Sequence, residues 1–223
     1  LFIALVASAS WQDVLKFLAA TPFGQTDPLF GRDVAFYVFT LPVYSLVLGL
    51  AKTLIVISLV GCGLIYILRG SLNLTSILGK FDLASLSEKL GGPAVKLMKH
   101  TSVDQGARMH IGMLLALFLA TAAVGTHLSL YNLLTSQSGA VFGAAFTDAN
   151  IMVPILRASV FTYGLAAMLA LYYGMSGKFS PLIGAITLTV LVGLASAVVP
   201  SVFQKLVVAP NELVKETPFI KRN

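Results

Sequence analysis

The stretch that decides the fold is PVYSLVLGLAKTLIVISLVGCGLIYIL, residues 42–68. It is longer than the roughly 20 residues that a helix needs to cross the hydrocarbon core of a bilayer, and its only charged side chain is Lys52. Its apolar residues are continuous and do not alternate with polar ones, which favours a helix over a strand of a β-barrel. The stretch therefore predicts a membrane-spanning helix.

The composition of the whole chain agrees with a membrane protein. Of its 223 residues, 57% are hydrophobic and only 11% are charged, and the mean hydropathy is +0.89. A soluble domain carries about 25% charged residues, so this chain has too few charges to cover a surface that faces water. Three further apolar blocks, at 111–134, 153–174 and 181–203, are also long enough to span.

We expect an all-α, polytopic transmembrane bundle of four full spans, with interfacial amphipathic helices beside it. The first residues, LFIALVAS at 1–8, are too short to cross a bilayer and are expected to form a partial span. The predicted segments are 1–41 (partial span and outer interfacial segment), 42–68 (span), 69–110 (cytoplasmic basic loop), 111–134 (span), 135–152 (outer loop), 153–174 (span), 175–180 (inner turn), 181–203 (span) and 204–223 (extracytoplasmic tail).

The charges of the loops predict the orientation of the spans. Residues 69–108 carry six Lys and Arg side chains against three acidic ones, whereas residues 135–152 carry no Lys or Arg. By the positive-inside rule, the basic loop 69–110 is expected on the cytoplasmic side of a bacterial inner membrane. Basic residues in the tail, such as Lys215 and Arg222, argue against this orientation.

Lipids are the expected partners of the basic loop. The net charge is +6, and the basic residues form no stripe with interleaved aromatic residues, so anionic lipids explain the charge better than nucleic acid does. Residues 71–108 carry apolar side chains at helical spacing with a Gly-Gly-Pro break at 91–93. This pattern predicts two short amphipathic helices on the inner surface, with an ordinary solvated connector as the alternative.

The segment before the first span is expected to lie at the outer water interface. Residues 10–23 read as an interfacial helix, and Asp27, Pro28 and Gly31 are typical of a turn. Asp33 can cap the helix that follows. The predicted interface anchors are Trp11, Arg32, Phe36, Tyr37, Phe39 and Tyr44.

Ionisable side chains inside spans are candidates for function, because removing them from water is costly. Lys52, His127 and Arg157 are such residues, and each falls in the outer third of its predicted helix. Asp148, in the adjacent outer loop, is the expected counter-ion of Arg157. The group could bind a lipid phosphate or another anion. Alternatively, the two cations reach the interface separately and His127 donates to a neighbouring helix.

No catalytic residue, metal site or cofactor is predicted. The sequence carries no metalloprotease, nucleophile-elbow or nucleotide-binding motif, and the single cysteine, Cys62, leaves no partner for an intrachain disulfide. His127 could ligate a haem or a pigment through its imidazole, although a lone histidine is more often a structural donor. In the tail, Asn211 is expected to cap a short helix, and Glu212 with Glu216 as a cation-binding pair is the alternative.

Three passages of the chain resemble uncharacterised protein family 0182, a family of large bacterial integral membrane proteins. They are FGQTDPLFGRDVAFYVFTLPVY at 23–44, SGAVFGAAFTDANIMVPIL at 138–156 and FQKLVVAPNELVKETPFIKRN at 203–223, and their order and spacing agree with the family. The resemblance covers most of the chain. It implies a multi-span region followed by a large extracytoplasmic part, and it brings no reaction and no catalytic residues.

The predicted function is therefore non-enzymatic: a structural or accessory membrane subunit, or a membrane anchor, that associates with other membrane subunits or with itself. Small residues on the spans allow helices to pack closely. These residues are Gly61, Gly63, Ala116, Ala120, Ala123, Gly164, Ala167, Gly184 and Gly193. The alternative function is a transporter or channel for an anionic or lipid substrate, which requires Lys52, His127 and Arg157 to face one cavity.

Overall fold

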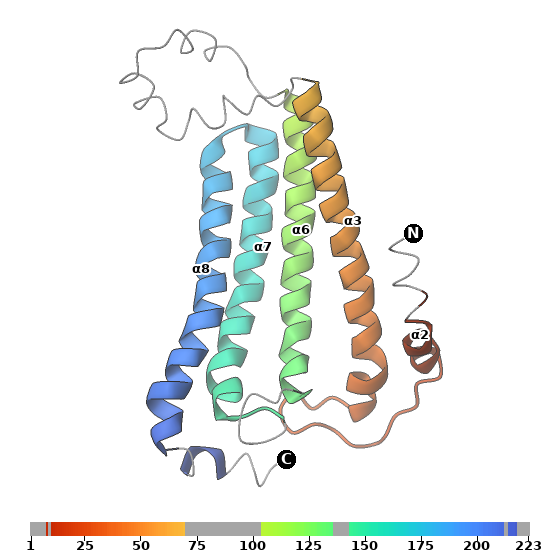
Figure 1. Cartoon of the computed structure of the whole chain (residues 1–223), viewed down its shortest axis with the longest axis vertical. Helices are drawn as coiled ribbons and strands as arrows, with labels where there is room; N and C mark the ends of the chain where they lie inside the picture. The colour runs from red at the N-terminus through yellow and green to blue at the C-terminus, as the bar shows by residue number, and fades with distance from the viewer. Residues whose placement is uncertain (1–7, 9, 70–103, 136–142, 212–213, 218–223) are drawn as a thin grey trace.

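The computed structural model of the chain describes residues 8, 10–69, 104–135, 143–211 and 214–217. Four long helices run side by side along the molecule (Figure 1). They form continuous helical stretches at Phe36–Leu68, Gln105–Thr135, Asp148–Ser176 and Phe179–Asn211, and each is long and apolar enough to cross a membrane. The predicted all-α fold with four spanning helices is confirmed. Residues 1–7 of the predicted partial span and residues 71–103 of the predicted amphipathic segment 71–108 lie outside the described residues.

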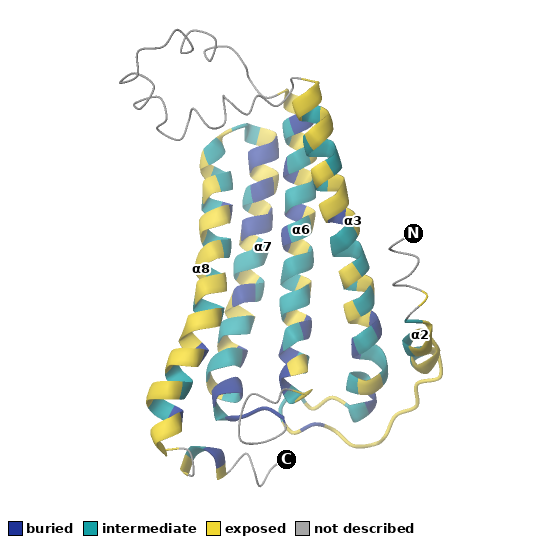
Figure 2. Ribbon diagram, viewed as in Figure 1, coloured by how far each residue is buried: buried dark blue, intermediate teal, exposed yellow. Residues whose placement is uncertain are grey.

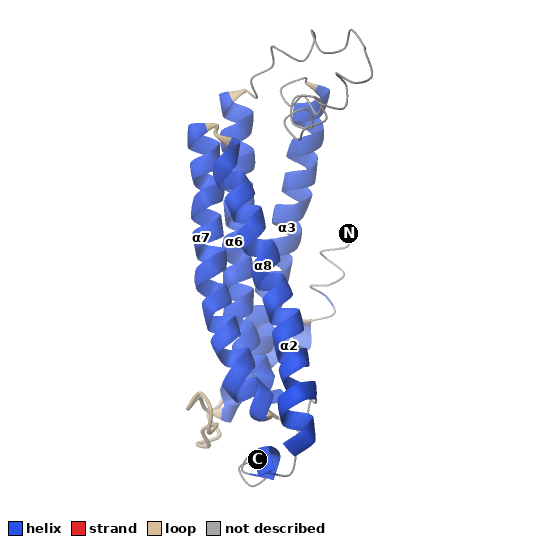
Figure 3. Ribbon diagram, turned by 90° about the vertical axis from the view of Figure 1, so that its left-hand side faces the viewer, coloured by secondary structure: helices blue, strands red, loops and turns tan. Residues whose placement is uncertain are grey.

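The elements follow one another in a simple order. A short helix at the N-terminal side is followed by the long helices, and Figure 3 shows helices and loops but no strand over the described ranges. The α-helices are α2 (Trp11–Leu18), α3 (Leu41–Leu68), α6 (Gln105–Asn132), α7 (Val153–Ser176) and α8 (Phe179–Phe203). The other turns are η1 (Phe36–Thr40), η3 (Leu133–Thr135), η4 (Asp148–Met152), η5 (Gln204–Val208) and η6 (Ala209–Asn211).

Three of the long helices contain a π-helical turn, and each such turn stands just before a proline. The turns are η1, η4 and η5, and the residue after each donates its N–H five residues back, as Leu41 does to Phe36. The prolines that follow are Pro42, Pro154 and Pro210. A proline ring inside an α-helix collides with the carbonyl four residues earlier. The wider turn relieves this collision, so the helices run on beyond the predicted apolar blocks.

The closest packing is between α6 and α7. A Cβ atom added to Gly112 of α6 would lie 2.8 Å from the Cα atom of Gly174 on α7, so only glycine permits this approach. Small side chains continue the contact along the pair. The buried residues here are Ala116, Leu119, Ala166, Ala167, Ala170 and, from α8, Ala185. α3 packs on α6 and α8 packs on α7, so the four helices follow the order α3, α6, α7, α8.

The outer two helices expose most of their apolar side chains (Figure 2). Helix α3 buries only Leu41, Val43 and Ile55, and α8 buries only Ala185 and Pro200. Gly61, Gly63, Gly164 and Gly193, which were predicted to allow close packing, have no atom within 4 Å of an added Cβ. An apolar surface of this kind is typical of helices that are surrounded by lipid or by other spans.

The polar loops gather at one end of the bundle, which we call the loop end. It comprises residues 19–35, 143–147, 204–211 and 214–217, and it lies at the bottom of Figure 1. The turn between α7 and α8, where Gly177 adopts a positive φ of 69°, lies at the opposite end. The candidate site residues lie at or near the loop end.

Candidate functional site

The carboxylate of Asp27 organises the turn before the first span. Asp27 is 9% exposed. Its Oδ1 accepts the N–H groups of Leu29 at 2.8 Å and Phe30 at 2.6 Å, and its Oδ2 accepts the N–H of Arg32 at 2.8 Å and the hydroxyl of Tyr37 at 2.7 Å. Four donors converge on this one side chain. Such a carboxylate fixes the backbone around it, as asparagine and aspartate do in tight turns.

Asp27 stays ionised because its donors outweigh its burial. Burial acts to raise the pKa of Asp27, but the hydrogen bonds from Tyr37 and from the backbone of Phe30, Arg32 and Leu29 lower that pKa below its ordinary value. A carboxylate whose pKa is lowered and whose oxygens already accept donors is a poor general acid or base at neutral pH. Its role in this loop is structural.

Asp33 closes the other side of the same turn. It accepts the N–H of Phe23 at 3.1 Å, of Gly24 at 2.9 Å and of Ala35 at 2.8 Å. The hydrogen bond from Ala35 is the largest of the effects that hold the pKa of Asp33 below its ordinary value. Gly24 and Gly31 supply the positive φ angles, 73° and 66°, that the turn requires. Asp27 and Asp33 therefore shape the chain where it enters the first helix.

An aromatic cluster joins this turn to α6. The ring of Tyr131 on α6 lies edge-on to Phe30 at 5.2 Å, to Phe36 at 5.0 Å, to Tyr37 at 6.2 Å and to His127 at 5.6 Å, measured between ring centroids. Edge-to-face pairs at these distances are favourable. The cluster holds the turn of Asp27 against the loop end of α6.

The predicted interface anchors occupy different surroundings. Phe36 and Tyr37 belong to the Tyr131 cluster, and the guanidinium carbon of Arg32 lies 5.5 Å from the ring centroid of Phe36. The other anchors form no ring pair with Tyr131 among the described residues. Phe39 packs on Phe23 with 5.5 Å between ring centroids, Tyr44 packs on Phe17 at 6.4 Å, and Trp11 is 56% exposed.

His127 and Arg157 come together in one pocket. The pocket has a volume of about 290 Å³ and lies between α6 and α7 beside the turn of Asp27. Both side chains are exposed. The other residues that line it are Phe30, Leu130, Tyr131, Val160 and Phe161. We call this the Arg157 pocket.

Lys52 and Asp148 are not among the residues that line the Arg157 pocket. Lys52 lies where α3 meets α6, with its Nζ only 2.8 Å from where a Cβ on Gly125 would stand. Asp148 is 7% exposed, and its Oδ2 accepts the N–H of Ala145 at 3.2 Å. No ion pair joins Asp148 to Arg157 in the part of the chain that the structure describes.

Glu216 is a site residue whose surroundings the sequence did not reveal. It is only 1% exposed, and its Oε2 accepts the N–H of Phe146 at 3.2 Å. Its Oε1 is buried without a hydrogen-bond partner among the described residues. The sequence suggested Glu216 only as half of a pair with Glu212, which lies outside the described ranges. No local pattern could have found the contact, because Phe146 is 70 residues away.

Other contacts strengthen the joint between the tail and the loop of residues 143–147. The ammonium group of Lys215 lies 4.8 Å from the ring centroid of Phe146 and 5.8 Å from that of Phe203, and these two rings stack with centroids 6.4 Å apart. The hydroxyl of Thr147 donates to the side chain of Gln204. We call this set of contacts the tail joint.

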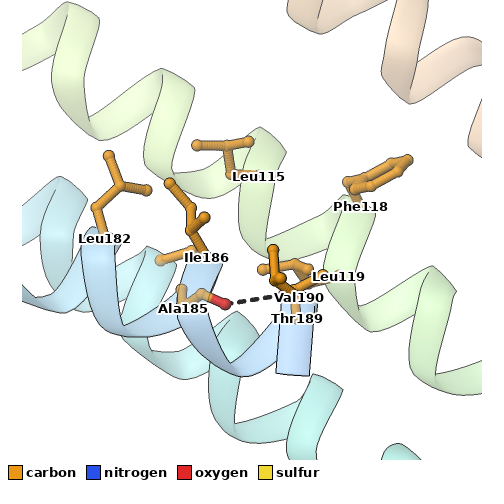
Figure 4. A pocket seen from close by; sticks show the side chains of 9 residues that line it. Leu115, Phe118, Leu119, Leu182, Ala185, Ile186, Thr189 and Val190 are labelled. Atoms are coloured by element: carbon orange, nitrogen blue, oxygen red, sulfur yellow. Dashed lines mark hydrogen bonds between the residues drawn. The ribbon is translucent and has the colours of Figure 1, made fainter. Parts of the chain in front are cut away.

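A second pocket is lined almost entirely by apolar side chains. It has a volume of about 190 Å³ and lies between α6 and α8, over Ala170 of α7. Figure 4 shows Leu115, Phe118 and Leu119 of α6 facing Leu182, Ile186 and Val190 of α8. Its one polar side chain, Thr189, donates to the carbonyl of Ala185 on its own helix. This pocket offers contact surface but no reactive group.

The histidines and Arg157 are the remaining groups to consider for a site. No group of three or more His, Cys, Asp or Glu residues suited to a metal ion occurs within the described ranges. His127 lies edge-on to Tyr131, and His110, far along the same helix, shares a hydrogen bond of 2.9 Å with the Tyr66 hydroxyl. The Arg157 pocket combines a permanent cation with an imidazole and with aromatic and aliphatic side chains.

The sequence matches known proteins along its whole length. The model of the uncharacterised protein family UPF0182 matches residues 1–223. A UPF0182 protein of Kocuria rhizophila is 33% identical over 100% of this chain and 20% of its own length, and one of Trichlorobacter lovleyi is 29% identical over 100% of this chain and 23% of its own. One of Thermobifida fusca is 30% identical over 97% of this chain and 19% of its own.

The chain spans about a fifth of the length of these curated relatives. No solved structure matches it. The names of the relatives state no reaction and no substrate. The resemblance seen in the three sequence passages is confirmed, and the chain belongs to the uncharacterised protein family UPF0182.

Proposed function

We propose that this chain is a non-enzymatic membrane anchor that fixes the position of the chain leaving the fourth span. In this proposal the protein lies in the bacterial inner membrane, with residues 69–110 in the cytoplasm and the loop end outside. The loop charges support this orientation through the positive-inside rule. The relatives are about five times longer than this chain, which supports a role as one region of a larger protein.

The tail joint is the observation that carries the proposal. A segment that only connected two domains would be expected to lie on the surface with its polar groups in water. Here Glu216 is buried against the backbone of Phe146, and Lys215 lies over two stacked rings. These contacts tie residues 215 and 216 to a loop between the second and third spans. Whatever follows the fourth span would therefore start from a defined position and direction.

The roles of the acidic residues favour an anchor over an enzyme. At the loop end, Asp27 and Asp33 accept backbone donors that shape the entrance turn, and Asp148 accepts the N–H of Ala145. Lys52 lies at the contact of α3 with α6, away from the Arg157 pocket. The transport alternative needed Lys52, His127 and Arg157 around one cavity, so transport is not included in the proposal.

Association with other membrane subunits or with a second copy is part of the proposal. Its support is the exposed apolar surface of α3 and α8, where glycines such as Gly61 and Gly193 leave room for a neighbouring helix. Light scattering on the protein extracted in a mild detergent tests this part. A monomer with no stoichiometric partner would contradict the association. The anchor role would then depend only on the test of the tail joint.

Electron paramagnetic resonance tests the anchor role directly. A nitroxide label is attached at Val214→Cys, which is 79% exposed in the native chain, with Cys62 replaced by serine. We expect slow label motion in the parent protein and fast motion in Glu216→Ala, because the substitution removes the acceptor of the Phe146 N–H. Asp13→Ala, which removes an exposed carboxylate on α2, is the matched control and should leave the motion slow. Equal motion in the parent and in Glu216→Ala would overturn the proposal.

A further inference from the structure

The Arg157 pocket lies at a depth where a lipid headgroup meets its acyl chains. Arg157 is nine residues after Asp148, the start of the third long helical stretch, which corresponds to about 14 Å at 1.5 Å per residue. His127 is eight residues before Thr135, the end of the second long helical stretch, which corresponds to about 12 Å. A pocket this close to the ends of two spanning helices opens beside the interfacial region of the bilayer.

The charge of Arg157 is not balanced by a described carboxylate. The guanidinium is always protonated, and in the described ranges it makes no ion pair. Asp27 already accepts four donors, and Asp148 accepts the N–H of Ala145. An arginine at the edge of the hydrocarbon region is costly unless an anion pairs with it. The pocket therefore attracts an anion from outside the chain.

The other side chains that line the pocket favour one class of anion over others. The His127 ring is held edge-on against Tyr131, so its N–H has a restricted direction in which to donate. Guanidinium groups bind phosphate oxygens in pairs, with better geometry than an ammonium group. The remaining lining is apolar and includes Val160 and Phe161, which follow Arg157 by three and four residues on α7, and Phe161 is 80% exposed. A charged group with apolar side chains next to it fits a phosphate that is attached to a hydrocarbon chain.

We propose that the Arg157 pocket binds the phosphate group of an anionic phospholipid. Arg157 pairs with the phosphate oxygens, and His127 donates a further hydrogen bond. Val160 and Phe161 contact the glycerol and the first methylene groups of the acyl chains. The inference does not depend on the anchor role, because it concerns a different set of side chains from the tail joint.

Native mass spectrometry of the detergent-solubilised chain tests this site. The probes are phosphatidylglycerol and diacylglycerol with the same acyl chains, which lacks the phosphate. We expect one phosphatidylglycerol molecule to bind per chain, with an affinity about ten-fold higher than that of diacylglycerol. Arg157→Gln should lose that preference. Arg32→Gln removes a cation at the same end of the bundle but outside the pocket, and it should bind like the parent protein.

Circular dichroism shows whether Arg157→Gln folds like the parent protein. A second variant keeps the test valid if it does not. Val160→Trp fills the pocket while keeping the arginine, and it should also lose the bound lipid. Retention of parent-like binding by both pocket variants would overturn the site, and so would an equal loss in Arg32→Gln. Inorganic phosphate added at millimolar concentration should not displace the lipid. Displacement would contradict the lipid assignment and identify a soluble phosphate as the ligand.

Discussion

Asp27 and Glu216 are both buried carboxylates at the loop end, but they are held by different means. Asp27 accepts four hydrogen bonds, all from donors within ten residues of it. Glu216 accepts one, from Phe146, which is 70 residues earlier, and its second oxygen has no partner among the described residues. Asp27 therefore shapes the turn in which it lies, whereas Glu216 joins two parts of the chain that are far apart in sequence. The effects of substitutions at the two positions should therefore differ in size and in how much of the structure they disturb.

Asp27→Ala should have the largest effect. The substitution leaves three backbone N–H groups and the Tyr37 hydroxyl without their acceptor. Buried donors without a partner cost about 1–3 kcal/mol each when water cannot replace the acceptor, so we expect a loss of about 3 kcal/mol in unfolding free energy. Unfolding in mixed micelles, followed by circular dichroism, measures it. Asp13→Ala, on the exposed face of α2, should change the same quantity by less than 0.5 kcal/mol.

Glu216→Ala should have a smaller and more local effect. It removes one acceptor and leaves a small cavity, which together cost about 2 kcal/mol. Glu216→Gln should cost only about 0.5 kcal/mol, because the amide oxygen can still accept the Phe146 N–H. Hydrogen exchange of the Phe146 amide distinguishes the two variants. If alanine and glutamine weakened protection of that amide equally, the hydrogen bond would not be what holds the tail joint.

Acidification should produce the smallest of the three effects and should act through Asp27. The pKa of Asp27 in the folded chain lies below its ordinary value of 3.8. Its contribution to stability is therefore complete above pH 3.8 and is lost as the pH falls through the folded-state pKa. The difference in unfolding free energy between the parent and Asp27→Asn should shrink in that range. Asp33, whose pKa is also lowered in the parent, is present in both proteins, so the comparison isolates Asp27.

Tyr37→Phe provides the control for the pH experiment. It removes one of the four donors to Asp27 and leaves the three backbone donors in place. The pKa of Asp27 should then lie closer to its ordinary value, and the loss of stability should begin at a higher pH than in the parent. An unchanged pH dependence in Tyr37→Phe would show that the hydroxyl does not contribute to holding the carboxylate ionised.

The fold was predictable because a membrane-spanning helix is identified from hydropathy averaged over many consecutive residues. Each span carries enough consecutive apolar residues to identify it without knowledge of its neighbours. The entrance turn was also partly predictable, since Pro28, Gly31 and Asp33 are local signals. The burial of Asp27 was not, because its fourth donor, Tyr37, comes from the start of the next helix.

The candidate site was harder to predict because the rotation of a helix depends on its partners. The sequence placed Lys52, His127 and Arg157 at similar depths by counting residues from the helix ends. It could not tell which face of each helix they occupy. The close approach of α6 to α7 at Gly112 and Gly174 is one of the contacts that set those faces. Lys52 of α3 lies against Gly125 of α6, whereas His127 and Arg157 share a pocket between α6 and α7.

The wide turns before the prolines have a mechanical consequence. An α-helix rotates by about 100° per residue about its axis. A turn closed over five residues changes this rotation, so the side chains on either side of the turn point in different directions than in an uninterrupted α-helix. In the first span, the turn Phe36–Thr40 itself carries the rings of Phe36 and Tyr37, and it lies just before Pro42. The wide turn before Pro42 therefore changes the direction in which those two rings leave the helix axis. This direction decides whether they meet Tyr131.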